Sequence, residues 1–249
     1  MIDAHLHLDR FEDRLPEALS QIGRLSIRAL AVSMDVTSYE ETLQIAEGEP
    51  LVIPAFGVHP WEAYRYVSDL SALKDPLENA IAYGEIGLDY HFVRDESRQA
   101  DQRAVFAMFL DAAEAKGRLI NVHTKGAEKA VLDALKGRSL PAVIVHWYSG
   151  PLELVDEFLD LGAYFTVGLD VLRSELIRSL AVRLPADRLL TETDNPGAWE
   201  WIAGEIGFPS QIEFVEQVLA DIWGMERNEL SRKVEENFAR VLQAGSVTI

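Results

Sequence analysis

Short apolar runs recur along the whole chain, and longer segments with a helical periodicity separate them. The runs at residues 119–122 and 142–145 contain almost no polar residues, whereas a strand with one exposed face alternates between apolar and polar positions. Unbroken runs are typical of parallel strands that are covered on both faces. The pattern predicts strands at residues 2–5, 29–34, 51–56, 81–86, 119–123, 142–146, 164–167 and 189–193.

The segments between these runs place their apolar residues on one helical face. Within residues 101–116, Val105, Met108, Phe109 and Ala112 form a stripe with the 3.6-residue period of an α-helix. The same pattern predicts helices over residues 38–47, 125–135, 151–161, 171–183, 212–223 and 228–242. Residues 194–208 are rich in glycine and tryptophan, and we expect a long loop there.

Eight strands that alternate with helices in 249 residues predict a (β/α)8 barrel of the TIM type. An open doubly wound sheet is the alternative, but it usually carries a glycine-rich phosphate loop after its first strand. Here that position holds His5-Leu6-His7. No linker rich in proline, glycine or serine divides the sequence, so we expect a single α/β domain over residues 1–249 with its active site at the C-terminal strand ends.

The charge balance limits the partners of this protein. Lysine and arginine number 23 against 41 aspartates and glutamates, which gives a formal net charge of −18 at pH 7. A protein of this charge repels polyanions at long range, which disfavours tight non-specific binding to duplex nucleic acid. Bound divalent cations reverse the sign of the potential locally, so the charge does not exclude a nucleic-acid substrate.

The chain contains no cysteine, which excludes disulfides, thiolate catalysis and zinc sites built on cysteine. No apolar run approaches the ~20 residues that span a bilayer. Residues 1–5 pass straight into polar sequence, without the basic and apolar regions of a leader. We therefore expect a cytoplasmic protein without a membrane partner.

Ionisable side chains gather where predicted strands end. Three carboxylates and five of the six histidines lie at a C-terminal strand end or a few residues beyond it: His5, His7, His59, Glu85, His123, His146, Glu192 and Asp194. In a barrel these ends converge on one mouth, so residues far apart in sequence meet in space. Imidazoles and carboxylates without cysteine are ligands for zinc or for a Mg- or Mn-like ion.

Taken singly, each of these residues has a simpler interpretation. His123 and His146 each follow an apolar strand and could hydrogen-bond to backbone, and Asp194 could cap a turn. Glu85 lies within an apolar strand, where an unpaired carboxylate costs several kcal/mol, so it needs a cation or a strong hydrogen-bond partner. The five tryptophans are interpreted as core or loop anchors, with Trp199 and Trp201 near the mouth as the exceptions. The conjunction of so many potential ligands at strand ends favours a metal site.

Ordered motifs along nearly the whole chain support this interpretation. They are Asp3-Ala4-His5-Leu6-His7-Leu8-Asp9, Gly57-Val58-His59-Pro60, Gly84-Glu85-Ile86-Gly87-Leu88-Asp89-Tyr90, His123, His146 with Ser149-Gly150, Glu192-Thr193-Asp194 and the closing residues 235–242. With these motifs the chain resembles the TatD-like metal-dependent hydrolases, amidohydrolase-type barrels that include deoxyribonucleases. The resemblance implies single-stranded or damaged DNA ends as the substrate.

The resemblance also implies a centre of two divalent ions, whether Zn, Mn, Ni or Mg, that activates water. It assigns His5 and His7 to the first ion, His123 and His146 to the second, and Glu85 as the bridge. Asp194 is expected to contact both metal and the attacking water.

Three further residues receive roles around the ions. His59 is expected to bind the substrate phosphate and to transfer a proton, Lys125 to hold a phosphate oxygen, and Glu192 to orient the ligands during catalysis.

Two departures from the family pattern concern the substrate. Thr124-Lys125-Gly126 replaces the usual Ser-Arg of the nucleases, and lysine lacks the bidentate fork of arginine. The usual arginine stretch and Asn-Glu-Pro have no counterpart between Pro196 and Pro209. A phosphodiesterase or deoxyribonuclease is therefore the first hypothesis, and an amidase, lactonase or deaminase acting on a small molecule is the second. A non-catalytic binding subunit is the third, which the complete set of six predicted ligands disfavours.

Overall fold

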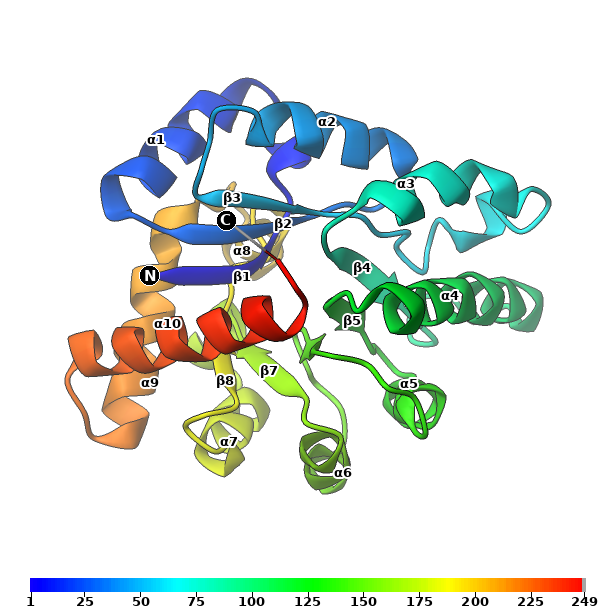
Figure 1. Ribbon diagram of the computed structural model, residues 1–249. Coiled ribbons are helices and arrows are strands. Elements are labelled where there is room, and N and C mark those ends of the chain that lie inside the picture. Colours follow the sequence, from blue (N-terminus) through cyan, green and yellow to red (C-terminus); the bar gives the residue numbers. More distant parts are fainter. Residues whose placement is uncertain (248–249) are drawn as a thin grey trace.

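A computed structural model describes residues 1–247 of the chain (Figure 1). Eight strands appear, each within three residues of a predicted position, so the predicted strands are confirmed. Their bounds are β1 Ile2–Leu6, β2 Arg28–Val32, β3 Val52–Ala55, β4 Tyr83–Gly87, β5 Ile120–His123, β6 Val143–Val145, β7 Tyr164–Val167 and β8 Leu189–Thr191. The strands that pair do so in parallel, and their residues are buried almost throughout, which is why the apolar runs are unbroken.

Helices follow the strands and lie outside them in Figure 1. The α-helices are α1 Leu15–Leu25, α2 Val36–Ala46, α3 Lys74–Asn79, α4 Glu96–Lys116, α5 Glu128–Leu135, α6 Val155–Asp160, α7 Glu175–Arg183, α8 Gly197–Ala203, α9 Ile212–Trp223 and α10 Arg227–Ala244. Short 3-10 helices precede or connect several of them: η1 Leu8–Arg14, η2 Ala63–Arg65, η3 Leu70–Leu73, η4 Leu152–Leu154, η5 Leu169–Leu172 and η6 Pro209–Gln211. Within the described residues, no helix is both long and apolar enough to cross a membrane.

The strands form a (β/α)8 barrel in two hydrogen-bonded groups, β1-β2-β3 and β4-β5-β6-β7-β8. Backbone bonds just beyond the strands join the groups on both sides. On one side Gly84 N donates to Phe56 O at 2.9 Å, and on the other Asp194 N donates to His5 O at 2.8 Å. The second bond fixes the end of β8 against β1, so the first and the last strand of the barrel contribute neighbouring residues to the mouth.

The prediction of a long loop at residues 194–208 is wrong in part, because α8 forms within this segment. Gly204 has a φ of +77° and occupies the C-cap of α8, where its backbone N–H bonds to Glu200 O. A glycine in the left-handed conformation is a common helix end, so Gly204 terminates a helix here, although the glycine content of this segment predicted a loop. Helices α1 and α3 were also outside the predicted set.

Candidate metal centre

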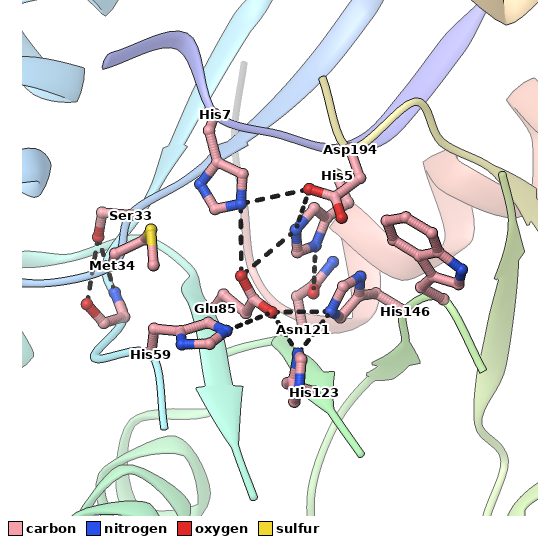
Figure 2. A network of polar contacts seen from close by, with 12 residues as sticks. His5, His7, Ser33, Met34, His59, Glu85, Asn121, His123, His146 and Asp194 are labelled. Atoms are coloured by element: carbon pink, nitrogen blue, oxygen red, sulfur yellow. Dashed lines mark hydrogen bonds and ion pairs between the residues drawn. The ribbon is translucent and has the colours of Figure 1, made fainter. Parts of the chain in front are cut away.

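Glu85 lies at the centre of a ring of histidines at the mouth of the barrel (Figure 2). Its side chain is only 3% exposed and projects from β4. The backbone of Glu85 also packs tightly against Gly57, where an added Cβ would lie 2.3 Å from Glu85 N. Only glycine permits this approach. The other five predicted ligands meet around this carboxylate: His5, His7, His123, His146 and Asp194.

The Oε2 side of Glu85 forms a four-atom cage with three other residues. His5 Nε2 lies 3.6 Å from Glu85 Oε2 and 3.5 Å from Asp194 Oδ1. His7 Nε2 lies 3.4 Å from each of the same two oxygens. Nitrogen and oxygen ligands at 2.0–2.2 Å around a tetrahedral zinc are separated from one another by roughly 3.3–3.6 Å. These four separations therefore fit the ligands of one divalent cation.

The Oε1 side is packed more tightly. Oε1 lies 2.6 Å from His123 Nδ1 and 2.8 Å from His146 Nε2, and these two nitrogens are 3.2 Å apart. These are hydrogen-bond distances, shorter than most separations between ligands of one ion. The residue types on this side suit a second cation, but the side chains must separate and release protons to admit it.

Unmet hydrogen-bond capacity identifies the same region. His5 Nε2, His146 Nδ1 and Glu192 Oε2 are buried and have no hydrogen-bond partner among residues 1–247. His5 Nε2 points between Glu85 and Asp194, so its lone pair faces the four-atom cage. Buried polar atoms without partners are rare, and each costs free energy unless a ligand or water contacts it. The donor set and this unpartnered nitrogen both fit a bound metal ion.

Opposing charges keep the carboxylates ionised. Burial raises the pKa of Glu85, but the neighbouring His59 and His146 rings and the hydrogen bonds from His123 and His146 together hold it well below its usual range. Burial likewise raises the pKa of Asp194, and its hydrogen bond with His7 and the charges of nearby histidines lower it further than burial raises it. At neutral pH both carboxylates are therefore charged, as metal ligands must be.

The histidines show the complementary effect. Burial lowers the pKa of His7, but its hydrogen bonds with Asp194 and Glu85 raise it to about 10. The pKa of His146 is raised well above its ordinary value, because Glu85 and Glu192 outweigh the effect of burial. A metal ion competes with protons for these nitrogens, so metal affinity is expected to rise with pH.

The hydrogen-bond partner of one ring nitrogen determines whether the other nitrogen, which faces Glu85, carries a proton or a free lone pair. His5 Nδ1 donates to Asn121 Oδ1 at 2.9 Å, because the Asn121 amide nitrogen already donates to Ala4 O. His5 Nε2 is then unprotonated and available to a cation. Sequence reasoning missed Asn121, although a polar residue in the buried strand β5 was a visible signal.

Asp89 orients the ring of His123 and was also missed. Its Oδ2 lies 3.3 Å from His123 Nε2, on the ring edge opposite Glu85. Asp89 can hold a proton on Nε2 when a cation replaces the proton that Nδ1 shares with Glu85. Asp89 is fully buried, and its position in the predicted motif 84–90 carried the signal.

His59 has the opposite tautomer. Its Nδ1 accepts a hydrogen bond from Trp61 N at 3.2 Å, so the proton of the neutral ring lies on Nε2, 3.4 Å from Glu85 Oε1. Burial lowers the pKa of His59 despite the nearby Glu85, which keeps the ring neutral at pH 7. His59 therefore presents an N–H donor to the centre rather than a lone pair, and this separates it chemically from His5.

The other two predicted site residues lie outside the central cluster. Glu192 is fully buried behind His146, with Oε2 3.7 Å from His146 Nδ1 and Oε1 accepting from Trp147 N. Lys125 donates to Ser149 Oγ at 2.8 Å and forms no ion pair among the described residues. The predicted roles of Glu192 and Lys125 stay predictions.

Asp3 connects β1 to the loop that carries Asp194. It is fully buried, and its two oxygens contact Thr193 N at 2.9 Å and Thr193 Oγ1 at 2.6 Å. Burial raises the pKa of Asp3 to about 8, against the lowering effect of these hydrogen bonds. Asp3 thus retains its proton near neutral pH, and it holds the residue that precedes Asp194.

This raised pKa predicts a pH-dependent stability. In the unfolded chain Asp3 loses its proton near pH 4, whereas the folded protein keeps it up to about pH 8. Its contribution to the free energy of unfolding is complete below pH 4 and is lost as the pH rises toward 8, by up to about 1.4 kcal/mol per pH unit. Asp3→Asn removes this term. Urea unfolding of chelator-treated protein at pH 5, 6 and 7 measures the difference between the two chains, and parallel pH profiles would contradict the prediction.

Comparisons with known proteins agree with the fold and identify the family. The sequence model of the family described as TatD related DNase matches residues 2–243. The chain is 27% identical to the Uncharacterized metal-dependent hydrolase YabD of Bacillus subtilis (strain 168), over 96% of this chain and 97% of that protein. It is 28% identical to the 3'-5' ssDNA/RNA exonuclease TatD of Edwardsiella piscicida, over 79% of each chain. The crystal structure of YJJV, a TatD homologue from Escherichia coli K12, has a TM-score of 0.87 and 24% identity, with 97% of both chains covered.

Proposed function

This chain belongs to the TatD related DNase family, whose relatives include metal-dependent hydrolases, and we propose that it hydrolyses phosphodiester bonds in single-stranded nucleic acid. The observation that carries the proposal is the cage of His5 Nε2, His7 Nε2, Glu85 Oε2 and Asp194 Oδ1, whose separations suit one divalent ion. His123 and His146 complete a second position around Glu85 Oε1. Divalent ions bound at such a centre lower the pKa of water and offset the charge of a phosphoryl group.

Asp194 is the carboxylate that reaches the substrate. Its side chain is 17% exposed, against 3% for Glu85 and 0% for His5. An ionised carboxylate at the open side of the centre can orient the attacking water and accept its proton. Asp194 therefore acts as the general base in the proposed reaction.

His59 supplies a hydrogen-bond donor from the opposite side. Its Nε2–H points toward Glu85 Oε1 because Trp61 N occupies Nδ1. A neutral imidazole that carries its proton on the inner nitrogen can donate to a phosphate oxygen or protonate the leaving oxygen.

Hydrolysis of an amide or lactone, or deamination, is the second candidate. It is favoured by the position of Lys125, which is bonded to Ser149, because a phosphate then finds fewer free cations at this mouth. The same metal chemistry polarises a carbonyl group, so the substrate decides between the candidates.

Metal removal and replacement test the proposal. We expect chelator-treated protein to lose hydrolysis of bis(p-nitrophenyl) phosphate and of single-stranded DNA, and added Zn, Mn, Ni or Mg to restore it. Elemental analysis of protein purified without chelator should find two ions per chain. Turnover of amides or lactones, with no phosphodiester hydrolysis under any of the four metals, would overturn the proposal in favour of the second candidate.

A further inference from the structure

Two aromatic side chains are exposed side by side near the candidate metal centre. Trp61 follows β3 and is 38% exposed, and Phe92 follows β4 and is 52% exposed. Their rings are 5.6 Å apart and nearly perpendicular, at 83°. We call this pair the aromatic corner. Large apolar surfaces that remain in contact with water next to a polar centre are typical of ligand-binding sites.

The aromatic corner lies one side chain away from the central carboxylate. The Trp61 ring is 4.6 Å from the His59 ring, and His59 Nε2 is 3.4 Å from Glu85 Oε1. In Figure 2, His59 points from its loop directly at Glu85. A ligand held at the centre therefore has this aromatic surface next to it, within the reach of a single nucleotide.

One buried carboxylate holds the Trp61 ring and the backbone of Phe92. Asp89 Oδ2 accepts a hydrogen bond from Trp61 Nε1 at 2.7 Å, and Asp89 Oδ1 accepts from Phe92 N at 2.8 Å. Because Asp89 also contacts His123, the orientation of the corner is fixed relative to the predicted ligands. Rings that are already ordered lose little conformational entropy when a ligand binds.

The charges beside the corner identify the kind of ligand. Arg98 donates to Trp61 O at 2.8 Å and lies over the Tyr64 ring at 4.1 Å, and Arg94 donates to His91 O. Neither arginine forms an ion pair within the part of the chain that the structure describes, despite the net charge of −18. Aromatic faces flanked by unpaired cations suit single-stranded nucleic acid, in which bases stack and phosphates are attracted.

We propose that the aromatic corner binds the base of the nucleotide that adjoins the reacting phosphodiester, in a single-stranded substrate. This inference rests on the proposed function and names the feature of the substrate that the site recognises. A base within a duplex is stacked on its neighbours and is not free to enter the corner, so the subsite selects single strands or frayed ends. The tryptophan in this subsite is Trp61, whereas the sequence singled out Trp199 and Trp201 as the tryptophans that are not simple core or loop anchors.

Steady-state kinetics on matched oligothymidylates test the subsite. One substrate carries every base, and the others each replace one nucleotide by an abasic tetrahydrofuran residue. We expect Phe92→Leu to raise KM for the complete strand by roughly 5- to 100-fold, with kcat nearly unchanged. Removal of the base beside the cleaved bond should raise KM for the wild type by a similar factor. On that abasic substrate, Phe92→Leu should raise KM little further. This non-additivity is the coupling that a double-mutant cycle detects.

Two other variants separate stacking from general damage. Phe214→Leu on α9 is the matched control, because Phe214 is also 52% exposed, and it should behave as wild type. Trp61→Phe keeps an aromatic face but loses the hydrogen bond to Asp89, so its KM should lie between the values of the wild type and of Phe92→Leu. Circular dichroism checks that each variant is folded.

A binding measurement separates failure of the subsite from failure of the proposed function. Fluorescence anisotropy of fluorescein-labelled oligothymidylate, with metal-loaded protein carrying Asp194→Asn to prevent turnover, should show weaker binding when Phe92→Leu is added. If the wild type binds the strand but cleaves no phosphodiester, the proposed function is wrong and the subsite stands. Equal behaviour of Phe92→Leu and Phe214→Leu, a KM indifferent to every base, or no binding at all would overturn the subsite.

Discussion

Glu85→Gln is expected to abolish phosphodiester hydrolysis, with a loss of about 10³-fold or more in kcat/KM. Glu85 contacts both halves of the centre, with Oε2 facing His7 and Oε1 facing His123 and His146. Glutamine has the same size but no charge, so both cation positions lose their shared anionic ligand. Elemental analysis should therefore find fewer ions per chain than in the wild type, alongside the loss of hydrolysis of bis(p-nitrophenyl) phosphate.

Glu216→Gln is the control for this variant. Glu216 is also buried, at 1% exposure, but it lies on α9 and bonds to Ser231 instead of to the centre. Its replacement should leave metal content and hydrolysis unchanged while the circular dichroism spectra of both variants match the wild type. If Glu85→Gln kept a normal metal content and rate, the assignment of Glu85 as the shared ligand would be wrong.

Asp194→Asn is expected to lower kcat by about 10²–10⁴-fold, the range that general acid–base groups contribute. Asp194 has a φ of +51°, in the left-handed region, and asparagine tolerates that conformation better than most residues. The backbone bond from Asp194 N to His5 O should therefore persist. The loss should fall on kcat more than on KM, because the amide cannot accept the proton of the attacking water.

Asp187→Asn, at the opposite end of the same strand, is the control for this variant. Asp187 is exposed and precedes β8, whereas Asp194 follows β8 at the mouth. We expect wild-type kinetics for Asp187→Asn. A kcat of Asp194→Asn within tenfold of the wild type would remove Asp194 from the role of proton acceptor, even if metal binding were weakened.

The positions of most elements were predictable because the barrel buries its strands on both faces. The run at residues 164–167 coincides with β7, and the helix predicted at 212–223 coincides with α9. Where an element is short or buries only one face, its hydrophobic pattern was a weaker signal. Helix α8 has one buried residue, Ala198, and begins at Gly197, so neither periodicity nor composition distinguished it from a loop.

The candidate site could be predicted as a set of residue types but not as a set of contacts. His5, Glu85 and Asp194 were recognisable because they end or interrupt apolar strands whose ends must meet in a barrel. Their supporting residues have partners far away in the sequence. Asn121 is 116 residues from His5, and Asp3 is 190 residues from Thr193, so no local pattern links them.

By itself, the sequence determined a barrel of alternating strands and helices and the collection of metal-binding side chains at its mouth, since both follow from periodicity and from strand ends. Only the tertiary structure decided which nitrogen of each histidine points inward. His5 turns its unpartnered Nε2 toward Glu85, whereas His59 turns an N–H. The reason is physical: a proton on an imidazole goes to the nitrogen whose neighbour accepts it, and that neighbour comes from another part of the chain.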